Sequence, residues 1–173
     1  MSYDINCHSC PYFQQKHLPI TQHTSRISPP IELEAHGSST LLIFQAPGDI
    51  EWAVGQAIQP TTKIGGTAGV RIRNSWVRRG KIREDFDITN AVQCFPGNGG
   101  ARDIKPTDAA ISFCAERLMK ALEEGHYSNV IAFGDVAHDV ATRLTKNIGS
   151  RPPVTYCPHP NGGVSNSKLD SLW

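Results

Sequence analysis

Short apolar runs alternate with amphipathic stretches along this chain of 173 residues, and that alternation limits the folds it can adopt. Apolar runs closed by proline or glycine are typical of buried parallel strands, and they predict strands at 40–44, 85–92, 129–133 and 153–156. Helical spacing of apolar residues predicts helices over 67–79, 107–124 and 136–145. We therefore expect an α/β fold, a three-layer sandwich with a central, mostly parallel four-stranded sheet flanked by helices.

The length and the composition predict one globular domain. A chain of 173 residues can bury one hydrophobic core but is short for two. We expect a single domain over residues 1–173, with an N-terminal arm of roughly residues 1–37. No apolar run approaches the ~20 residues that a membrane span requires, and no basic-then-apolar leader precedes Cys7. These features predict a cytoplasmic monomer that has no membrane partner.

Four of the five cysteines have the spacing of metal ligands. Cys7 and Cys10 form a Cys-x-x-Cys pair, in which two intervening residues let both thiolates face one metal centre. Cys94 and Cys114 would complete a cage of four sulfur atoms. Spacing alone leaves zinc, a 4Fe-4S cluster, a redox pair and unconnected thiols open. The odd cysteine, Cys157, argues against complete disulfide pairing, and we interpret it as a packed thiol.

Basic residues are unevenly distributed, although the formal net charge is only +1. The segment 71–83 contains no acidic residue and holds a basic cluster that consists of Arg71, Arg73, Arg78, Arg79, Lys81 and Arg83. Such a cluster can bind phosphates locally on a near-neutral protein, and a solvated helix face is an equally weighted alternative.

Ligands of parallel sheets bind at the carboxyl ends of the strands, so the loops at those ends are the place to look for a site. The predicted loops there are 45–48, 90–100, 134–135 and 158–163. None of them contains a Walker loop, a Gly-x-Gly-x-x-Gly fingerprint or a nucleophile elbow.

Taken in order with the cysteines, these loops resemble the uracil-DNA glycosylase superfamily, and within it the iron-sulfur type called family four. The resemblance covers nearly the whole chain. It is carried by Gln45-Ala46-Pro47-Gly48, Gly66-Thr67-Ala68-Gly69, the segment 88–94, the Pro106-Thr107 helix start, the segment 130–134 and the segment 155–160. The resemblance implies a 4Fe-4S cluster on Cys7, Cys10, Cys94 and Cys114. It also implies that DNA is the partner, and that the chain is a monofunctional DNA glycosylase. Such an enzyme hydrolyses the N-glycosidic bond of a flipped-out uracil or other modified pyrimidine and leaves an abasic site.

The resemblance further implies roles in a pocket for the flipped base. His159 would donate to a ring oxygen of the departing base, where negative charge develops as the C–N bond breaks. Asn90 would read the base edge with its carboxamide. Outside this context, the two would be a surface histidine in a turn and a loop-capping asparagine. Val164, in the loop after His159, is our prediction for the wedge that fills the gap in the duplex, with a hydrophobic contact within the protein as an equally weighted alternative. Further substrate contacts are expected at Ala46, Pro47 and Gly48.

Two positions depart from the family-four pattern. Glutamate usually stands where this chain has Gln45, and an amide cannot act as a general base. Ala46 beside it resembles family five. Gln45 and backbone carbonyls would then orient the water, or Asp49 or Glu51 would activate it, although both acids are more typical of a solvated loop. Ile64 stands where family-four enzymes have an aromatic residue that stacks on the flipped base. The substitution loses a stacking free energy of ~1–3 kcal/mol. It also leaves room for a pyrimidine substituted at its five position. The alternative function is a DNA-binding protein that has lost catalysis.

Overall fold

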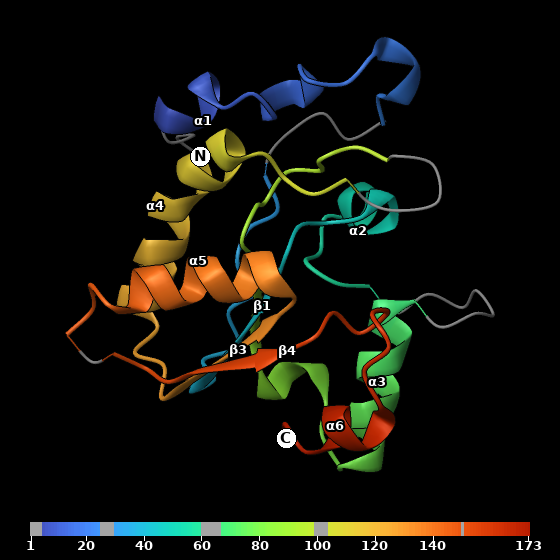
Figure 1. The fold of residues 1–173 in the computed structure, drawn as a ribbon, viewed down its shortest axis with the longest axis vertical. Helices are drawn as coiled ribbons and strands as arrows, with labels where there is room; N and C mark the ends of the chain where they lie inside the picture. The colour runs from blue at the N-terminus through green and yellow to red at the C-terminus, as the bar shows by residue number, and fades with distance from the viewer. Residues whose placement is uncertain (1–4, 25–29, 60–66, 99–103, 150) are drawn as a thin grey trace.

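A parallel four-stranded sheet forms the centre of the protein (Figure 1). The structure is a computed structural model, and it describes residues 5–24, 30–59, 67–98, 104–149 and 151–173. The strand order is β2-β1-β3-β4. The strands are β1 (Thr40–Phe44), β2 (Asp87–Asn90), β3 (Asn129–Phe133) and β4 (Val154–Cys157). The predicted α/β fold with a central parallel sheet and helices around it is confirmed.

Helices connect and cover the strands. The α-helices are α1 (Ile5–Ser9), α2 (Asp49–Val54), α3 (Ala68–Arg78), α4 (Asp108–Glu124), α5 (Asp135–Thr145) and α6 (Asn166–Asp170). Short 3-10 helices span Phe13–Gln15, Ile20–Gln22 and Arg83–Asp85. The sequence predicted α3, α4 and α5 to within two residues at each end. It did not predict α2 and α6, because helices of 5 or 6 residues are too short to show a periodic apolar pattern.

Side-chain caps explain where α3 and α4 begin. The Thr107 hydroxyl accepts a hydrogen bond from the Ala110 backbone N–H at 3.3 Å, and the Thr67 hydroxyl accepts one from the Val70 N–H at 3.4 Å. Each cap satisfies a donor that the first helical turn leaves without a partner. Thr107 thus begins α4 immediately after a proline, and Thr67 begins α3 beside the carboxyl end of the sheet.

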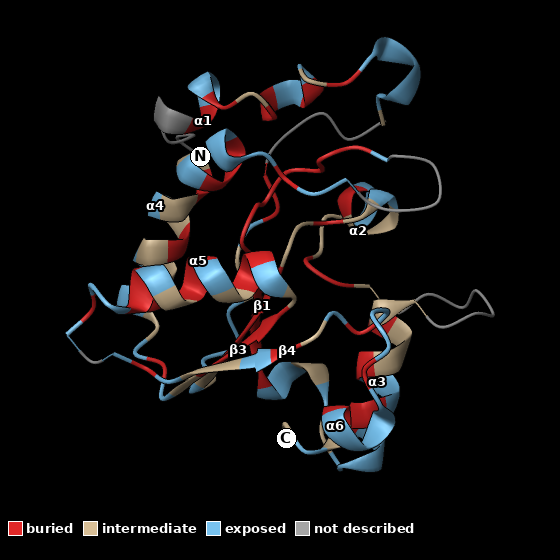
Figure 2. Ribbon diagram, in the orientation of Figure 1, coloured by how far each residue is buried: buried red, intermediate tan, exposed pale blue. Residues whose placement is uncertain are grey.

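The central strands are buried on both faces, as Figure 2 shows for the middle of the molecule. Leu41, Leu42 and Ile43 of β1 are fully buried. The register pairs Phe44 with Asn90 and Phe133 with Cys157, so the four strands end at one edge of the sheet. The loops that follow the strands therefore converge there, as the topology requires.

The N-terminal segment lies along the loop after β2 and against α4. The Tyr12 hydroxyl accepts a hydrogen bond from the Thr107 backbone N–H at 2.9 Å, and the Ile31 N–H donates to the Gln93 carbonyl at 2.8 Å. Figure 1 shows α1 beside the start of α4. These contacts bring Cys7 and Cys10 toward the regions that contain the other two predicted metal ligands.

Candidate functional site

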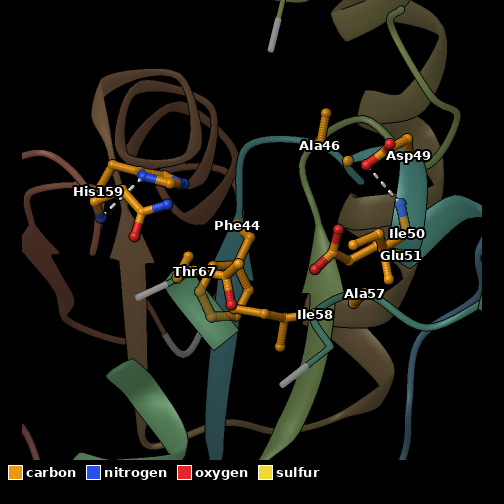
Figure 3. A pocket seen from close by; sticks show the side chains of 12 residues that line it. Phe44, Ala46, Asp49, Ile50, Glu51, Ala57, Ile58, Thr67 and His159 are labelled. Atoms are coloured by element: carbon orange, nitrogen blue, oxygen red, sulfur yellow. Dashed lines mark hydrogen bonds between the residues drawn. The ribbon is translucent and has the colours of Figure 1, made fainter. Parts of the chain in front are cut away.

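A cavity of about 160 Å³ lies at the carboxyl ends of the strands. An engineered cavity of ~150 Å³ accommodates a benzene ring, so this volume suits one flat ring of that size. Four segments form the walls: the end of β1 with α2, the stretch after α2, the start of α3, and the loop after β4 (Figure 3). The lining residues are Phe44, Ala46, Gly48, Asp49, Ile50, Glu51, Ala57, Ile58, Thr67, Ala68, His159 and Asn161.

His159 lines this cavity from the loop after β4. Its Nδ1 accepts a hydrogen bond from the Asn161 backbone N–H at 3.3 Å, drawn in Figure 3. A neutral imidazole that accepts at Nδ1 carries its proton on Nε2, so Nε2 is the donor nitrogen. The Gly162 N–H donates to the His159 carbonyl at 2.6 Å, and a Cβ at position 162 would lie only 3.0 Å from that oxygen. Glycine at 162 therefore permits the tight turn that carries the histidine.

Asn90 lies one layer behind the cavity wall. Its side chain is 1% exposed, and its Nδ2 donates to the carbonyl of Ala57, a lining residue, at 3.3 Å. The Asn90 Oδ1 is buried and accepts no hydrogen bond in the part of the chain that the structure describes. A buried acceptor without a donor costs about 1–3 kcal/mol. Asn90 therefore has an unsatisfied acceptor next to the cavity, although its side chain does not itself line the cavity.

The first loop contributes less to the cavity than the sequence suggested. Ala46 and Gly48 line it, whereas the side chains of Gln45 and Pro47 do not. The Gln45 backbone carbonyl accepts from the Val92 N–H at 3.0 Å, which joins the loops after β1 and β2. The first loop therefore reaches the cavity through Ala46 and Gly48, and not through the Gln45 amide.

Two carboxylates face the cavity from the first turn of α2, on the side opposite His159 (Figure 3). The Asp49 Oδ1 accepts from the Ile50 N–H at 2.8 Å. The Glu51 Oε1 accepts from the Gln59 N–H at 3.1 Å. The sequence suggested solvated loop acids as the more typical state of both residues, but the fold places them in the wall of the site. Their position immediately after the Ala-Pro-Gly loop is the signal that made them candidates for activating the water in the sequence analysis.

Val164, the predicted wedge, lies away from the cavity. Val164 is 7% exposed and belongs to the hydrophobic core, so its side chain packs inside the protein and does not project as a wedge. Its alternative interpretation, a hydrophobic contact within the protein, matches this position. Ile64 lies outside the described residues.

The basic cluster separates into two groups. Arg71, Arg78 and Arg83 bind within the protein, whereas Arg73 and Arg79 are exposed and Lys81 is half-buried. Among the described residues, no side-chain hydrogen bond or ion pair engages these last three cations, although the charge of Arg79 contributes to lowering the pKa of Asp170.

The engaged cations have acidic or carbonyl partners. The Arg78 guanidinium donates to Asp170 at 2.7 and 2.9 Å, and these bonds, together with one from Ser75, lower the pKa of the Asp170 carboxyl to about 2. Arg83 binds Glu34 at 2.6 Å. These internal partners make the cluster smaller as a phosphate-binding surface than its sequence suggested.

Cys7, Cys10, Cys94 and Cys114 are all at least nine-tenths buried and form no disulfide. Burial raises the pKa of the Cys94 thiol, and the nearby Cys114, Cys10 and Cys7 raise it further. Burial likewise raises the pKa of Cys114 to about 11. Within the described residues, no three His, Cys, Asp or Glu side chains have the arrangement of a formed metal site. The four thiols thus lie in one neighbourhood without a preformed coordination geometry.

A comparison with protein families identifies the class. The family model of the uracil DNA glycosylase superfamily matches residues 32–173, which include every lining residue of the cavity. The chain belongs to this superfamily. Among curated proteins, none matches the chain significantly. The match begins after Cys7 and Cys10, so it does not test the cysteine pair. In the described part of the chain, no helix has the length and apolar character of a membrane span.

Proposed function

We propose that this protein is a monofunctional DNA glycosylase, which hydrolyses the N-glycosidic bond of a flipped-out uracil or other modified pyrimidine and leaves an abasic site. One observation carries the proposal: a cavity for a single ring lies between a histidine donor and two carboxylates at the carboxyl edge of the sheet. Breaking this bond separates charge, because the base departs with negative charge and the sugar becomes an oxocarbenium-like cation. A donor on one side and carboxylates on the other suit that separation.

His159 would stabilise the leaving base. Its Nε2 carries the proton when Nδ1 accepts from Asn161, so the imidazole can donate to a pyrimidine oxygen without first gaining a proton. The hydrogen bond would strengthen as the oxygen becomes negative, which lowers the barrier more than it favours substrate binding.

Asn90 would read the base. Its carboxamide is held by the Ala57 carbonyl, and the remaining acceptor, Oδ1, matches an N–H group on the edge of a pyrimidine. A buried acceptor rejects bases that offer no N–H at this point, because it would stay without a donor. Positions 46, 57 and 58 are Ala, Ala and Ile, small or aliphatic residues that leave the identity of the accepted pyrimidine open.

Water would attack from the α2 side. Asp49 and Glu51 supply the negative charge that Gln45 lacks, either by orienting the water or by facing the oxocarbenium ion. The sequence predicted that Gln45 and backbone carbonyls orient this water. Because the Gln45 side chain does not line the cavity, the backbone of the first loop at Ala46 and Gly48 would hold the water in place.

We also propose that the protein is of the iron-sulfur type, with Cys7, Cys10, Cys94 and Cys114 as ligands of a 4Fe-4S cluster. The four buried thiols, which form no disulfide, fit this group, because each would release its proton on binding iron and the positive iron would then compensate the charge of the buried thiolate. When bound, the cluster would supply a structural link between the N-terminal segment, the loop after β2 and α4. Hydrolysis of a glycosidic bond transfers no electrons, so the catalytic residues act independently of it.

The alternative, a DNA-binding member without catalysis, is favoured by one observation. Ala46 stands at the cavity wall in the first loop, and the Gln45 side chain does not line the cavity, so this loop offers no acidic side chain before Asp49. A protein of this kind would still flip and hold a base but would release none.

An incision assay separates the two functions. Oligonucleotides that contain uracil, hypoxanthine, mismatched thymine or a substituted cytosine are incubated with the protein and then cleaved with alkali at abasic sites. We expect cleavage of at least one pyrimidine substrate. His159→Ala should lower single-turnover base release by ~100-fold or more, comparable to the loss of one oxyanion donor.

Asn90→Ala should lower release as well, and it should reduce discrimination among the bases of the panel. Both variants should bind DNA with nearly unchanged affinity, measured by fluorescence anisotropy. If the wild type releases no base and His159→Ala changes nothing, the binding-protein alternative replaces the enzyme.

A further inference from the structure

We propose that Arg71 is a positioning residue, which holds the loop that carries His159, and that it is not a phosphate ligand as its place in the basic cluster suggested. The inference rests on the proposed function for its catalytic consequence. Its structural part, the attachment of a loop to a helix, stands on contacts within the protein alone.

Arg71 projects from α3 into the loop after β4. Its Nη1 donates to the Pro160 carbonyl, and its Nη2 donates to the Val164 carbonyl and to the Asn166 Oδ1, the latter at 3.3 Å. The side chain is half-buried, in contrast to Arg73, which is exposed on the same helix. A guanidinium that already bonds two backbone carbonyls has few donors left for a phosphate.

The two carbonyls bracket the turn that follows His159. Pro160 is the next residue after the histidine, and Val164 closes the loop before α6. The planar guanidinium has several N–H donors in a fixed fork, so it can set the separation of the two carbonyls. Arg71 therefore fixes the turn 160–163 against α3, and His159 at its start.

The rest of α3 makes this attachment rigid. Ser75 and Arg78 both bind Asp170 of α6, and the Trp173 Nε1 donates to the Ser75 Oγ at 2.8 Å. Figure 1 shows α3 and α6 side by side. The loop between β4 and α6 is thus held by the sheet at one end and by α3 at the other, with Arg71 in between.

The catalytic consequence follows from the position of the donor. A reacting group that is displaced by ~1 Å can lose about 100-fold in rate. Without Arg71, two carbonyls lose their donors and the loop is free to move away from α3. His159 would then no longer be held where its Nε2 meets the departing base.

The test compares Arg71→Met and Arg71→Lys with the wild type. At saturating DNA, we expect both variants to release base at least ~10-fold more slowly, with an unchanged salt dependence of DNA binding. Lysine should not rescue the rate, because a single ammonium cannot bridge two carbonyls. A phosphate contact predicts the opposite: the slope of log K against log salt decreases by about 0.9, and lysine restores binding. In a His159→Ala background, Arg71→Met should have no further effect on the rate, since the two residues act through one step.

Amide hydrogen exchange tests the attachment without substrate. Arg71→Met should increase exchange at residues 161–165, whereas Arg143→Met, an exposed arginine on α5, should leave it unchanged. If Arg71→Met does not fold, Arg71→Lys carries the same measurement. Unchanged exchange in the folded variant overturns the inference, and so does increased exchange with an unchanged rate of release. If the wild type is inactive on every oligonucleotide, the proposed function is wrong. The exchange measurement then still tests whether Arg71 attaches the loop to α3.

Discussion

At the residue scale, the two carboxylates of α2 provide the negative charge at the cavity that the first loop, with Gln45 and Ala46, does not provide. Glu51 is the stronger candidate for a catalytic carboxylate. Its Oε1 accepts a hydrogen bond from the backbone N–H of Gln59, which lies outside α2. Asp49 is exposed, and its carboxylate accepts only from the next residue in the chain among the hydrogen bonds of the described residues. Figure 3 shows the Glu51 side chain across the cavity from His159. A carboxylate in this position can stabilise the cationic sugar that develops in the transition state.

We predict that Glu51→Gln lowers single-turnover base release by ~10-fold or more, because the substitution keeps the shape of the side chain and removes its charge. Asp49→Asn should have a smaller effect. Glu123→Gln, at an exposed position near the end of α4, is the control for a lost carboxylate. Equal rates for Glu51→Gln and the wild type would mean that the carboxylate is not needed and that the backbone of the first loop orients the water.

At the element scale, β2 is joined to the N-terminal segment through one buried carboxylate. The Asp87 Oδ1 accepts from the backbone N–H groups of His36 and Ser38 at 2.7 and 3.0 Å, and its Oδ2 accepts from the Tyr127 hydroxyl at 2.8 Å. Removing it leaves three donors without their acceptor. Asp87→Ala should therefore lower the free energy of unfolding by about 3 kcal/mol, and Tyr127→Phe by about 1 kcal/mol. Urea denaturation measures both, and equal losses would show that the backbone donors find water instead.

The same contact predicts a pH dependence. Burial raises the pKa of the Tyr127 hydroxyl, and its hydrogen bond to Asp87 raises it further. A pKa that is higher in the folded than in the unfolded state gives stability that is complete below about pH 10 and decreases as the pH rises beyond it. Tyr127→Phe should flatten this alkaline decrease in a series of denaturation curves. A decrease that is unchanged in Tyr127→Phe would come from another group.

The two groups within the basic cluster should differ in what their replacement changes: DNA binding for the cations without a partner among the described residues, and stability for the cations that form ion pairs. Replacing Arg73, Arg79 and Lys81 together by alanine should weaken binding to any DNA sequence and lower the salt slope by about 0.9 for each phosphate that the variant no longer binds. Replacing Arg78 and Arg83 should instead lower stability, because each forms an ion pair within the protein. An unchanged salt slope in the triple variant would place the DNA-binding surface on another part of the protein.

At the scale of the whole molecule, the four buried cysteines come from segments that are far apart in the sequence. If they hold a 4Fe-4S cluster, the purified protein should be brown and contain about four irons per chain. Cys94→Ser should lose the colour and lower the thermal midpoint, because the cluster would join the N-terminal segment to the rest of the fold. Metal analysis that finds one zinc and no iron would replace the cluster by a zinc site and leave the glycosylase proposal in place.

The amino-acid sequence was enough to predict the presence of four strands, the three long helices and the loops that meet at the site. The prediction of 85–92 was too long for β2, since residue 85 belongs to a 3-10 helix, and the prediction of 153–156 was shifted by one residue from β4. The predicted bounds of β1 and β3 are those of the structure, because each strand has four consecutive apolar residues, buried in the core, after one polar residue at its start. The caps and apolar spacing of α4 are equally local signals. Since parallel strands end at one edge, the order of the motifs was enough to bring His159 and the first loop together.

Which side chains face the cavity, and which cations bind within the protein, depends on contacts between distant parts of the chain. Arg71 meets carbonyls 89 and 93 positions away, Arg78 meets a carboxylate 92 positions away, and Arg83 one 49 positions away. Sequence spacing within a helix carries no information on such partners, so six cations looked alike. Val164 was expected to project toward DNA and is buried in the core, whereas Glu51 was expected to be a solvated loop acid and lines the cavity. The reason is the same for both: the burial of a side chain depends on the elements that the fold packs against it.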